Sequence, residues 1–162
     1  MTVLRLRGFE IHKALLDPDA QRAVLDDVRK VVKAAPFFRP VTPGGQKMSV
    51  RMTSAGKYGW MTDADGYRYA ETHPNGQVWP AIPDTVLAIW DKLTGLDRQP
   101  ECCLINYYAA DAKMGMHQDS AEADFRLPVG SGSLGDEARY GIAGQRRRDR
   151  KDRGWLHTGA AG

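Results

Sequence analysis

Two short polar motifs near the middle of the chain have the residue types and spacing of a metal site. Asn106-Tyr107-Tyr108 is followed nine residues later by His117-Gln118-Asp119. In an extended segment, side chains two positions apart point to one face, so His117 and Asp119 can reach a single metal ion together. One imidazole and one carboxylate are two thirds of a 2-His-1-carboxylate iron site. The third ligand should be a histidine from a later strand, but only His157 follows and the chain ends at Gly162.

The strand expected before this pair presents polar groups on an otherwise apolar face. The run from Cys102 to Tyr108 is rich in β-formers, and Leu104, Asn106 and Tyr108 share one of its faces. A carboxamide and a phenol placed among apolar neighbours need partners, which a bound carboxylate or a metal-linked ligand would supply. Two alternatives stay open: an edge strand that faces water, and a His117–Asp119 pair that is only hydrogen-bonded.

Two helices are expected to support the strands by packing. The first begins with Asp17 as its cap and ends near Ala34, because Pro36 disfavours helix in the residue before it. The second follows Pro83-Asp84 and stops at Gly95. Their apolar faces are expected to be Val24, Leu25, Val28, Val31 and Val32 in the first helix, and Val86, Leu87, Trp90 and Leu93 in the second.

Between these helices lies a stretch rich in glycine and aromatic residues. Asp65-Gly66 and Asn75-Gly76 favour tight turns, and Met48 to Thr53 and Tyr67 to Tyr69 alternate as short strands do. We interpret the stretch as a β-hairpin lid. From Cys102 onward the pattern is strand-like again, with turn signals at Ala110-Asp111 and around Gly144, which predicts a β-sandwich or barrel in the second half.

Composition indicates one soluble globular domain in the cytoplasm. The chain has 162 residues, of which 42% are hydrophobic, and no apolar run reaches the roughly 20 residues that span a bilayer. It shows no signal-peptide pattern at its amino terminus. The two cysteines, Cys102 and Cys103, are adjacent and should face opposite sides of a strand, so we do not expect a disulfide between them, which indicates a reducing compartment. We expect both to serve as small buried hydrophobic residues.

The net charge of +3 is concentrated in one segment. Residues Arg146 to Arg153 read RRRDRKDR, with six basic and two acidic side chains. Such a cluster can hold phosphate backbones in a salt-sensitive manner, or it can be a solvated hairpin turn, which charge alone favours.

The motifs together resemble the bacterial AlkB family of iron(II)/2-oxoglutarate-dependent DNA dealkylases, in order over roughly residues 3 to 159. The matching segments are Val41-Thr42-Pro43-Gly44-Gly45, Met48-Ser49-Val50, Met52-Thr53, Gly59-Trp60, Gly66-Tyr67, Trp79-Pro80-Ala81, Cys103-Leu104-Ile105-Asn106, His117-Gln118-Asp119 and Ser133-Leu134-Gly135.

The resemblance implies a mainly β fold of the α+β class in a single domain, residues 1–162. It would comprise N-terminal packing helices, a nucleotide-recognition lid at about residues 41–80 and a jelly-roll (double-stranded β-helix) core from about residue 100. The implied activity is removal of methyl groups from 1-methyladenine and 3-methylcytosine in single-stranded DNA, and possibly RNA. The reaction would use Fe(II), dioxygen and 2-oxoglutarate and release succinate, carbon dioxide and formaldehyde. The protein would act as a monomer.

Roles follow from the resemblance position by position. His117 and Asp119 match the first two iron ligands, and Asn106 and Tyr108 match the groups that bind 2-oxoglutarate. The positions that match substrate contacts are Trp60, which stacks on the flipped base, Tyr67 and Tyr69 of the lid, and Arg147 in the basic cluster.

The sequence also departs from the family pattern. The third iron ligand and the two arginines that follow it have no match, because His157 is in the wrong place and residues 159–162 end the chain. Glycines interrupt the strand at Val129 to Gly135, and Ala121 replaces an acidic residue that contacts the base. One hypothesis is an incomplete copy of a dioxygenase that lacks the last core strands and does not catalyse. The other is a genuine short protein that binds nucleic acid through the lid aromatics and Arg146 to Arg153.

Overall fold

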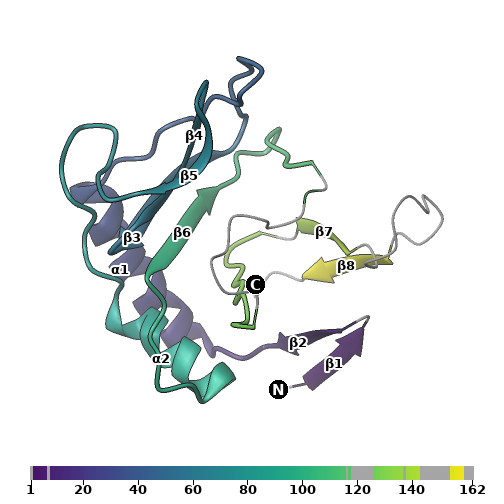
Figure 1. The fold of residues 1–162 in the computed structure, drawn as a ribbon. Coiled ribbons are helices and arrows are strands. Elements are labelled where there is room, and N and C mark those ends of the chain that lie inside the picture. Colours follow the sequence, from purple (N-terminus) through teal and green to yellow (C-terminus); the bar gives the residue numbers. More distant parts are fainter. Residues whose placement is uncertain are drawn as a thin grey trace. The chain divides into compact units, whose positions relative to one another are not determined.

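The computed structural model describes residues 2–6, 8–115, 117, 126–136, 138–142 and 154–158, with side chains up to residue 136. Most of the described elements are strands (Figure 1). They group into two compact units: Met1–Arg22 with Ser131–Gly162, and Ala23–Gly130. The mainly β class predicted from the sequence agrees with this content, while the closed jelly roll, the lid and the missing strands stay predictions.

The core of the second unit lies on one face of a two-stranded antiparallel ribbon. Strand β3 (Arg51–Gly56) pairs with β6 (Cys102–Tyr107), which places Ala55 opposite Cys103. Side chains alternate between the two faces of a strand, so Ala55, Cys103 and Ile105 share the face that packs on the core. That core includes Val31 and Ile82.

Helix α1 (Pro18–Ala34) begins and ends where the sequence predicts. The Asp17 carboxylate accepts a hydrogen bond from the Ala20 N–H at 2.8 Å, which satisfies one of the unpaired donors at the helix start. Val24 and Val31 are buried, as expected. Leu25, at the edge of the predicted apolar face, is 39% exposed. It adjoins the buried stripe, and the described residues leave this side chain only partly covered.

Helix α2 (Asp84–Thr94) also follows the prediction and stops at Gly95. Gly95 adopts φ 60°, a left-handed conformation that costs glycine little, and its N–H bonds the Asp91 carbonyl at 2.9 Å. Val86 and Leu87 pack against the core, whereas Leu93 is 38% exposed. The helix therefore packs through its first turns, as a supporting element.

The predicted lid contains a hairpin with the expected turn. Strand β4 (Gly59–Asp63) pairs with β5 (Gly66–Ala70), and Asp63 stands opposite Gly66 across the turn. The strand expected at Met48 to Thr53 instead begins at Arg51 and runs to Gly56, because its pairing with β6 covers that range. Asn75-Gly76 forms a turn, in which the Gly76 N–H bonds the His73 carbonyl at 2.8 Å.

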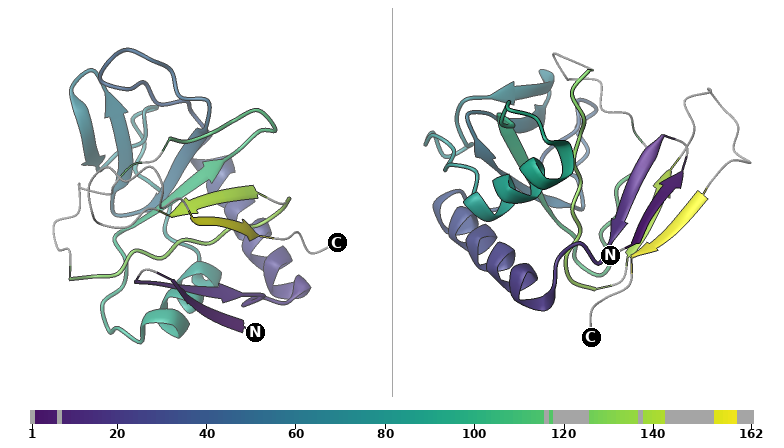
Figure 2. Two further views of the ribbon diagram at one scale, coloured as in Figure 1. Left: turned by 90° about the vertical axis from the view of Figure 1, so that its right-hand side faces the viewer. Right: turned by 90° about the horizontal axis from the view of Figure 1, so that it is seen from below.

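The first unit consists of two further antiparallel pairs, seen from other directions in Figure 2. Strand β1 (Thr2–Leu6) pairs with β2 (Phe9–Lys13), a hairpin that the sequence analysis did not anticipate. Strand β7 (Ala138–Ile142) pairs with β8 (Gly154–Thr158). The turn expected around Gly144 lies outside the described residues.

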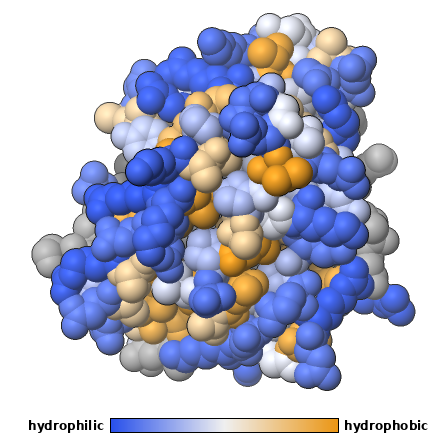
Figure 3. Space-filling model, turned by 90° about the vertical axis from the view of Figure 1, so that its left-hand side faces the viewer, coloured by the Kyte–Doolittle hydropathy of each residue, from blue (hydrophilic) through white to orange (hydrophobic). Residues whose placement is uncertain are grey.

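The face of the molecule in Figure 3 is mostly hydrophilic, with smaller hydrophobic areas between. In the part of the chain that the structure describes, no helix is both long and apolar enough to cross a membrane.

Candidate nucleotide and metal site

Three aromatic side chains predicted to contact the substrate share one face of the β4–β5 hairpin. Trp60 stands directly opposite Tyr69, and Tyr67 lies two positions before Tyr69 on the same strand. The Trp60 and Tyr67 rings lie 5.7 Å apart between centroids and are tilted by 31°. Tyr67 is 59% exposed and the other two are half-buried. The hairpin thus presents a partly open aromatic surface of the kind on which a planar base can stack.

Trp79, for which no site role was predicted, packs against this hairpin. Its indole N–H donates to the Ala70 carbonyl at 2.9 Å, and its ring meets the His73 ring edge-on at 5.1 Å. Gly59, just before Trp60, lies so close to the Trp79 ring that a Cβ there would overlap it. The close packing of Gly59 on the buried Trp79 ring therefore fixes the position of the β4 backbone next to Trp60.

His73 is a second structural residue of the lid. It is 6% exposed. Nδ1 accepts the Asn75 N–H at 3.1 Å and therefore carries no proton, so Nε2 donates to the Pro36 carbonyl at 2.8 Å. The ring, held in this tautomer, ties the turn at Asn75 to the chain that follows α1. Its burial in the structure is what distinguishes His73 from a candidate metal ligand. Burial cannot be recognised from the sequence alone.

One ion pair closes the hairpin. Both guanidinium nitrogens of Arg68 donate to the Asp63 carboxylate at 2.7 Å, and the Asp65 N–H donates to it at 2.9 Å. Charged and polar donors on the ionised form lower the pKa of Asp63 from 3.8 to about 2, with Arg68 as the main cause.

Strand β4 lies over the face of the ribbon that carries Asn106. Ser54, Leu104 and Asn106 share this face, because Ser54 pairs with Leu104 and Met52 pairs with Asn106. The Ser54 hydroxyl accepts the Trp60 N–H at 3.3 Å, which joins the lid strand to the same face. The structure therefore brings the predicted stacking residue and a predicted 2-oxoglutarate residue to one side of the ribbon.

Asn106 and Tyr108 are both exposed in the structure, whereas Met52 and Ser54, which share the face of Asn106, are buried. The face is therefore covered over β3 and open along β6. This matches the alternative of a water-facing strand more closely than the expectation of a carboxamide lodged among apolar neighbours. An open face is also accessible to a small ligand. The Tyr108 hydroxyl lies 3.9 Å from the Met114 sulfur, at the start of the segment that leads to His117.

The His117 ring is bonded to the backbone of its own loop. Its Nδ1 lies 3.0 Å from the Gly115 carbonyl oxygen, and a carbonyl only accepts, so Nδ1 carries the proton. In the neutral ring the lone pair is then on Nε2. A hydrogen bond from one ring nitrogen to a backbone carbonyl is the usual way in which proteins fix a metal-binding tautomer.

Several predicted site residues lie outside the described residues: Asp119, Arg147 and the Arg146 to Arg153 cluster, together with Ala121. Among the residues that are described, no three His, Cys, Asp or Glu side chains are grouped as a metal site would require. His157 lies in β8, where its backbone pairs with Arg139. The ligand assignments for His117 and Asp119 therefore stay predictions.

Cys102 and Cys103 are not joined by a disulfide. Burial raises the pKa of the Cys103 thiol above its ordinary value, which keeps it protonated and unreactive.

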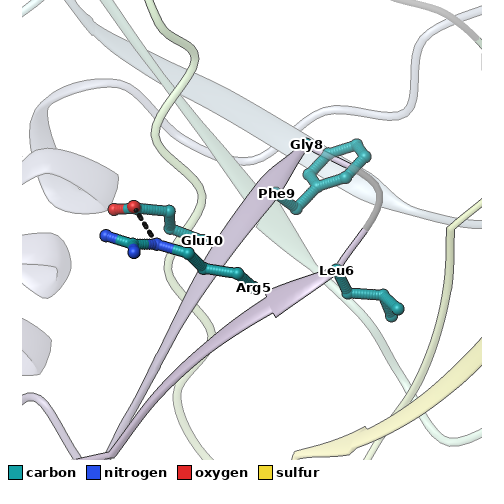
Figure 4. A pocket seen from close by; sticks show the side chains of 5 residues that line it. All are labelled: Arg5, Leu6, Gly8, Phe9 and Glu10. Carbon is teal, nitrogen blue, oxygen red and sulfur yellow. Dashed lines mark hydrogen bonds and ion pairs between the residues drawn. The ribbon is translucent and has the colours of Figure 1, made fainter.

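A shallow pocket on the β1–β2 hairpin contains none of the predicted site residues. It is lined by Arg5, Leu6, Gly8, Phe9 and Glu10. Figure 4 shows the Arg5 guanidinium bonded to the Glu10 carboxylate, while Leu6 and Phe9 pair across the hairpin one position further along. An ion pair that satisfies both of its own charges beside two apolar side chains gives this pocket no reactive group.

Comparisons with known proteins agree on one kind of enzyme. The model of the 2OG-Fe(II) oxygenase superfamily matches residues 8–161. An alpha-ketoglutarate-dependent dioxygenase AlkB homolog of Caulobacter vibrioides (strain NA1000 / CB15N) is 46% identical over 143 residues, which are 88% of this chain and 65% of that protein. The alpha-ketoglutarate-dependent dioxygenases AlkB of Salmonella typhimurium (strain LT2) and Escherichia coli (strain K12) are 42% and 39% identical, over 80% and 81% of this chain and 62% and 63% of their own lengths. The chain thus spans slightly less than two thirds of each relative. The predicted resemblance and cofactor class are confirmed.

Proposed function

Because the chain belongs to the 2OG-Fe(II) oxygenase superfamily, we propose that its function is oxidative demethylation of alkylated bases in nucleic acid. The proposed substrates are 1-methyladenine and 3-methylcytosine in single-stranded DNA, with RNA as a possible second substrate. Iron(II), dioxygen and 2-oxoglutarate are the proposed cofactor and cosubstrates. The proposed setting is a single domain that acts as a monomer in the cytoplasm.

The observation that carries this proposal is the aromatic face of the β4–β5 hairpin. A methyl group on a base edge is inaccessible inside a stacked strand, so the base has to leave the stack before it can be oxidised. Trp60 and Tyr67, with ring centroids 5.7 Å apart, offer a new stacking surface, and base–aromatic stacking contributes about 1–3 kcal/mol per base. This contribution offsets part of the cost of unstacking.

Four predicted site residues have the side-chain types that the cofactors of the family require. We propose that His117 and Asp119 hold iron(II), His117 through Nε2 because its Nδ1 donates to Gly115. Asn106 and Tyr108 would donate hydrogen bonds to a carboxylate of 2-oxoglutarate, since an amide and a phenol are both donors. The iron, when bound, supplies the oxidising chemistry that breaks the base–methyl linkage. The chain's own residues bind, orient and shield the base.

Binding to a labelled oligonucleotide tests the proposal without depending on turnover. The probe is a fluorescein-labelled single strand that contains one 1-methyladenine, and its anisotropy reports binding. Trp60→Ala should weaken binding by about 5- to 150-fold, the equivalent of losing one stacked base. Tyr107→Ala is the matched control, because Tyr107 is a 49% exposed aromatic on the opposite face of β6, packed near Phe37. Equal affinity of the Trp60 and Tyr107 variants would refute the proposed role of the hairpin.

The binding-only alternative makes a different use of the same surface. A chain that binds nucleic acid without catalysis needs the aromatic face and a basic patch but no metal. Addition of Mn(II) to the anisotropy assay separates the proposed catalytic function from the binding-only alternative. Under the proposed function, the metal and 2-oxoglutarate change the affinity of wild type but not that of His117→Ala. Identical behaviour of the two proteins would favour the binding-only alternative, and we propose Arg147 as a phosphate contact in either case.

A further inference from the structure

Ser49 joins the lid segment to the loop that leads to His117. Its hydroxyl donates to the Lys113 carbonyl at 3.0 Å and accepts the Lys113 N–H at 3.1 Å. One side chain thus pairs with both backbone polar groups of a single residue 64 positions away. In an antiparallel sheet, the N–H and carbonyl of one residue often bond the backbone of a single partner residue. Here the Ser49 hydroxyl takes that place, as both donor and acceptor.

The Ser49 end of this contact is anchored. Val50, the next residue, is fully buried, and β3 begins immediately after it at Arg51. Buried neighbours hold the backbone of Ser49 in place, so its hydroxyl is a fixed point on the lid side.

The Lys113 end has few other constraints. Four of the seven residues from Ala109 to Gly115 are alanine or glycine, and the Ala112 N–H closes a turn onto the Ala109 carbonyl at 2.9 Å. Lys113 itself is exposed. Small side chains bury little apolar area and so contribute little to fixing a loop. The contacts with Ser49 are therefore important for the position of this loop.

From Lys113 the chain reaches His117 in four residues. The Met114 sulfur lies 3.9 Å from the Tyr108 hydroxyl, and the Gly115 carbonyl accepts from the His117 ring. A displaced Lys113 would therefore move the residues that contact Tyr108 and orient His117.

We propose that Ser49 is a positioning residue that couples the nucleotide-recognition lid to the loop bearing the first iron ligand. When a base occupies the lid, the Ser49–Lys113 contact keeps His117 in register with the face that carries Asn106. This inference rests on the proposed function only for the identity of the ligands, a base at the lid and iron(II) at His117. The contact itself is a property of the chain.

Amide hydrogen exchange measured by NMR tests the contact directly. In Ser49→Ala the Lys113 amide should exchange about 2- to 12-fold faster, the change expected from losing one ordinary hydrogen bond. Ser49→Thr keeps the hydroxyl and should restore slow exchange. Thr42→Ala is the matched control, because the Thr42 hydroxyl also accepts a lid N–H, from Gln46 at 3.1 Å, but is not bonded to the loop.

Two further readouts separate positioning from local structure. The imidazole signals of His117 should shift in Ser49→Ala and stay at the wild-type position in Thr42→Ala and Ser49→Thr. The methylated oligonucleotide should slow exchange at Lys113 in wild type, and this protection should be lost in Ser49→Ala.

The outcomes distinguish this inference from the proposed function. If exchange at Lys113 and the His117 signals are unchanged in Ser49→Ala, the coupling is refuted whatever the chain binds. Equal oligonucleotide protection of Lys113 in wild type and Ser49→Ala refutes it as well. An oligonucleotide that fails to bind wild type refutes the proposed function, while shifted His117 signals in Ser49→Ala would still support the positioning role.

Discussion

Substitution of Gly59 by alanine tests whether buried packing sets the position of the lid. The added Cβ would overlap the Cε2 and Cζ2 atoms of the Trp79 ring. Trp79 is 5% exposed, its N–H is bonded to the Ala70 carbonyl at 2.9 Å, and His73 packs on its ring. The ring therefore has no free direction in which to move, and the hairpin must shift.

The expected cost follows from two contributions. Forcing an extra carbon into a well-packed core costs about 1–3 kcal/mol. Losing the indole hydrogen bond adds about 0.5–1.5 kcal/mol. We therefore expect Gly59→Ala to lower the free energy of unfolding by about 1.5–4.5 kcal/mol, a large part of the 5–15 kcal/mol typical of a domain.

Urea unfolding followed by circular dichroism measures this change. Gly44→Ala is the control, because a Cβ at Gly44 would meet only the Thr42 hydroxyl at 3.9 Å, so its stability should change by less than about 0.5 kcal/mol. In a Trp79→Leu background, which lacks the ring, Gly59→Ala should cost less than in wild type. Equal unfolding free energies for the Gly59 and Gly44 variants would refute the reasoning.

Three further predictions concern the supports of the site. The pKa of Asp63 is lowered to about 2 by Arg68, so the stabilisation from this pair is fully present above pH 3.8 and is lost as the pH falls toward 2; an NMR titration of the Gly66 amide should show this transition, and Asp63→Asn should abolish it. Thr53→Val should cost about 1–3 kcal/mol in thermal or urea unfolding, because it leaves the buried carbonyl of Ala35, now bonded at 2.7 Å, without its donor; an unchanged midpoint would contradict this. Neutralising Arg146 to Arg148 should reduce both the affinity for single-stranded DNA and its decrease with salt; a salt dependence equal to that of wild type would exclude these arginines as phosphate contacts.

The helices were predictable because their signals are local. The Asp17 cap and the Gly95 stop depend on a few neighbouring residues, and both helices begin and end at the predicted places. The Asp65-Gly66 turn was predictable for the same reason, since glycine at this point adopts φ 104°. The start of β3 was not, because strand ends depend on a partner strand about 50 residues away.

For the predicted site, the sequence supplies candidate residue types but does not show which of them are neighbours. Trp60, Tyr67 and Tyr69 were chosen by resemblance, and the register of β4 with β5 places them on one face. The exposure of Asn106 could not be read from its apolar neighbours in sequence, because exposure depends on which elements cover the ribbon.

The sequence by itself determined which chemistry the chain can be related to: the H-x-D pair, the aromatic lid residues and the ordered motifs of an iron(II)/2-oxoglutarate oxygenase. It did so because ligand types and turn residues are properties of single positions. Only the tertiary structure showed that Ser54 joins Trp60 to the face of Asn106, that Gly115 orients His117 and that Ser49 reaches Lys113. The Ser49–Lys113 contact joins residues 64 positions apart. All three contacts depend on how the strands and loops pack, which no single position specifies.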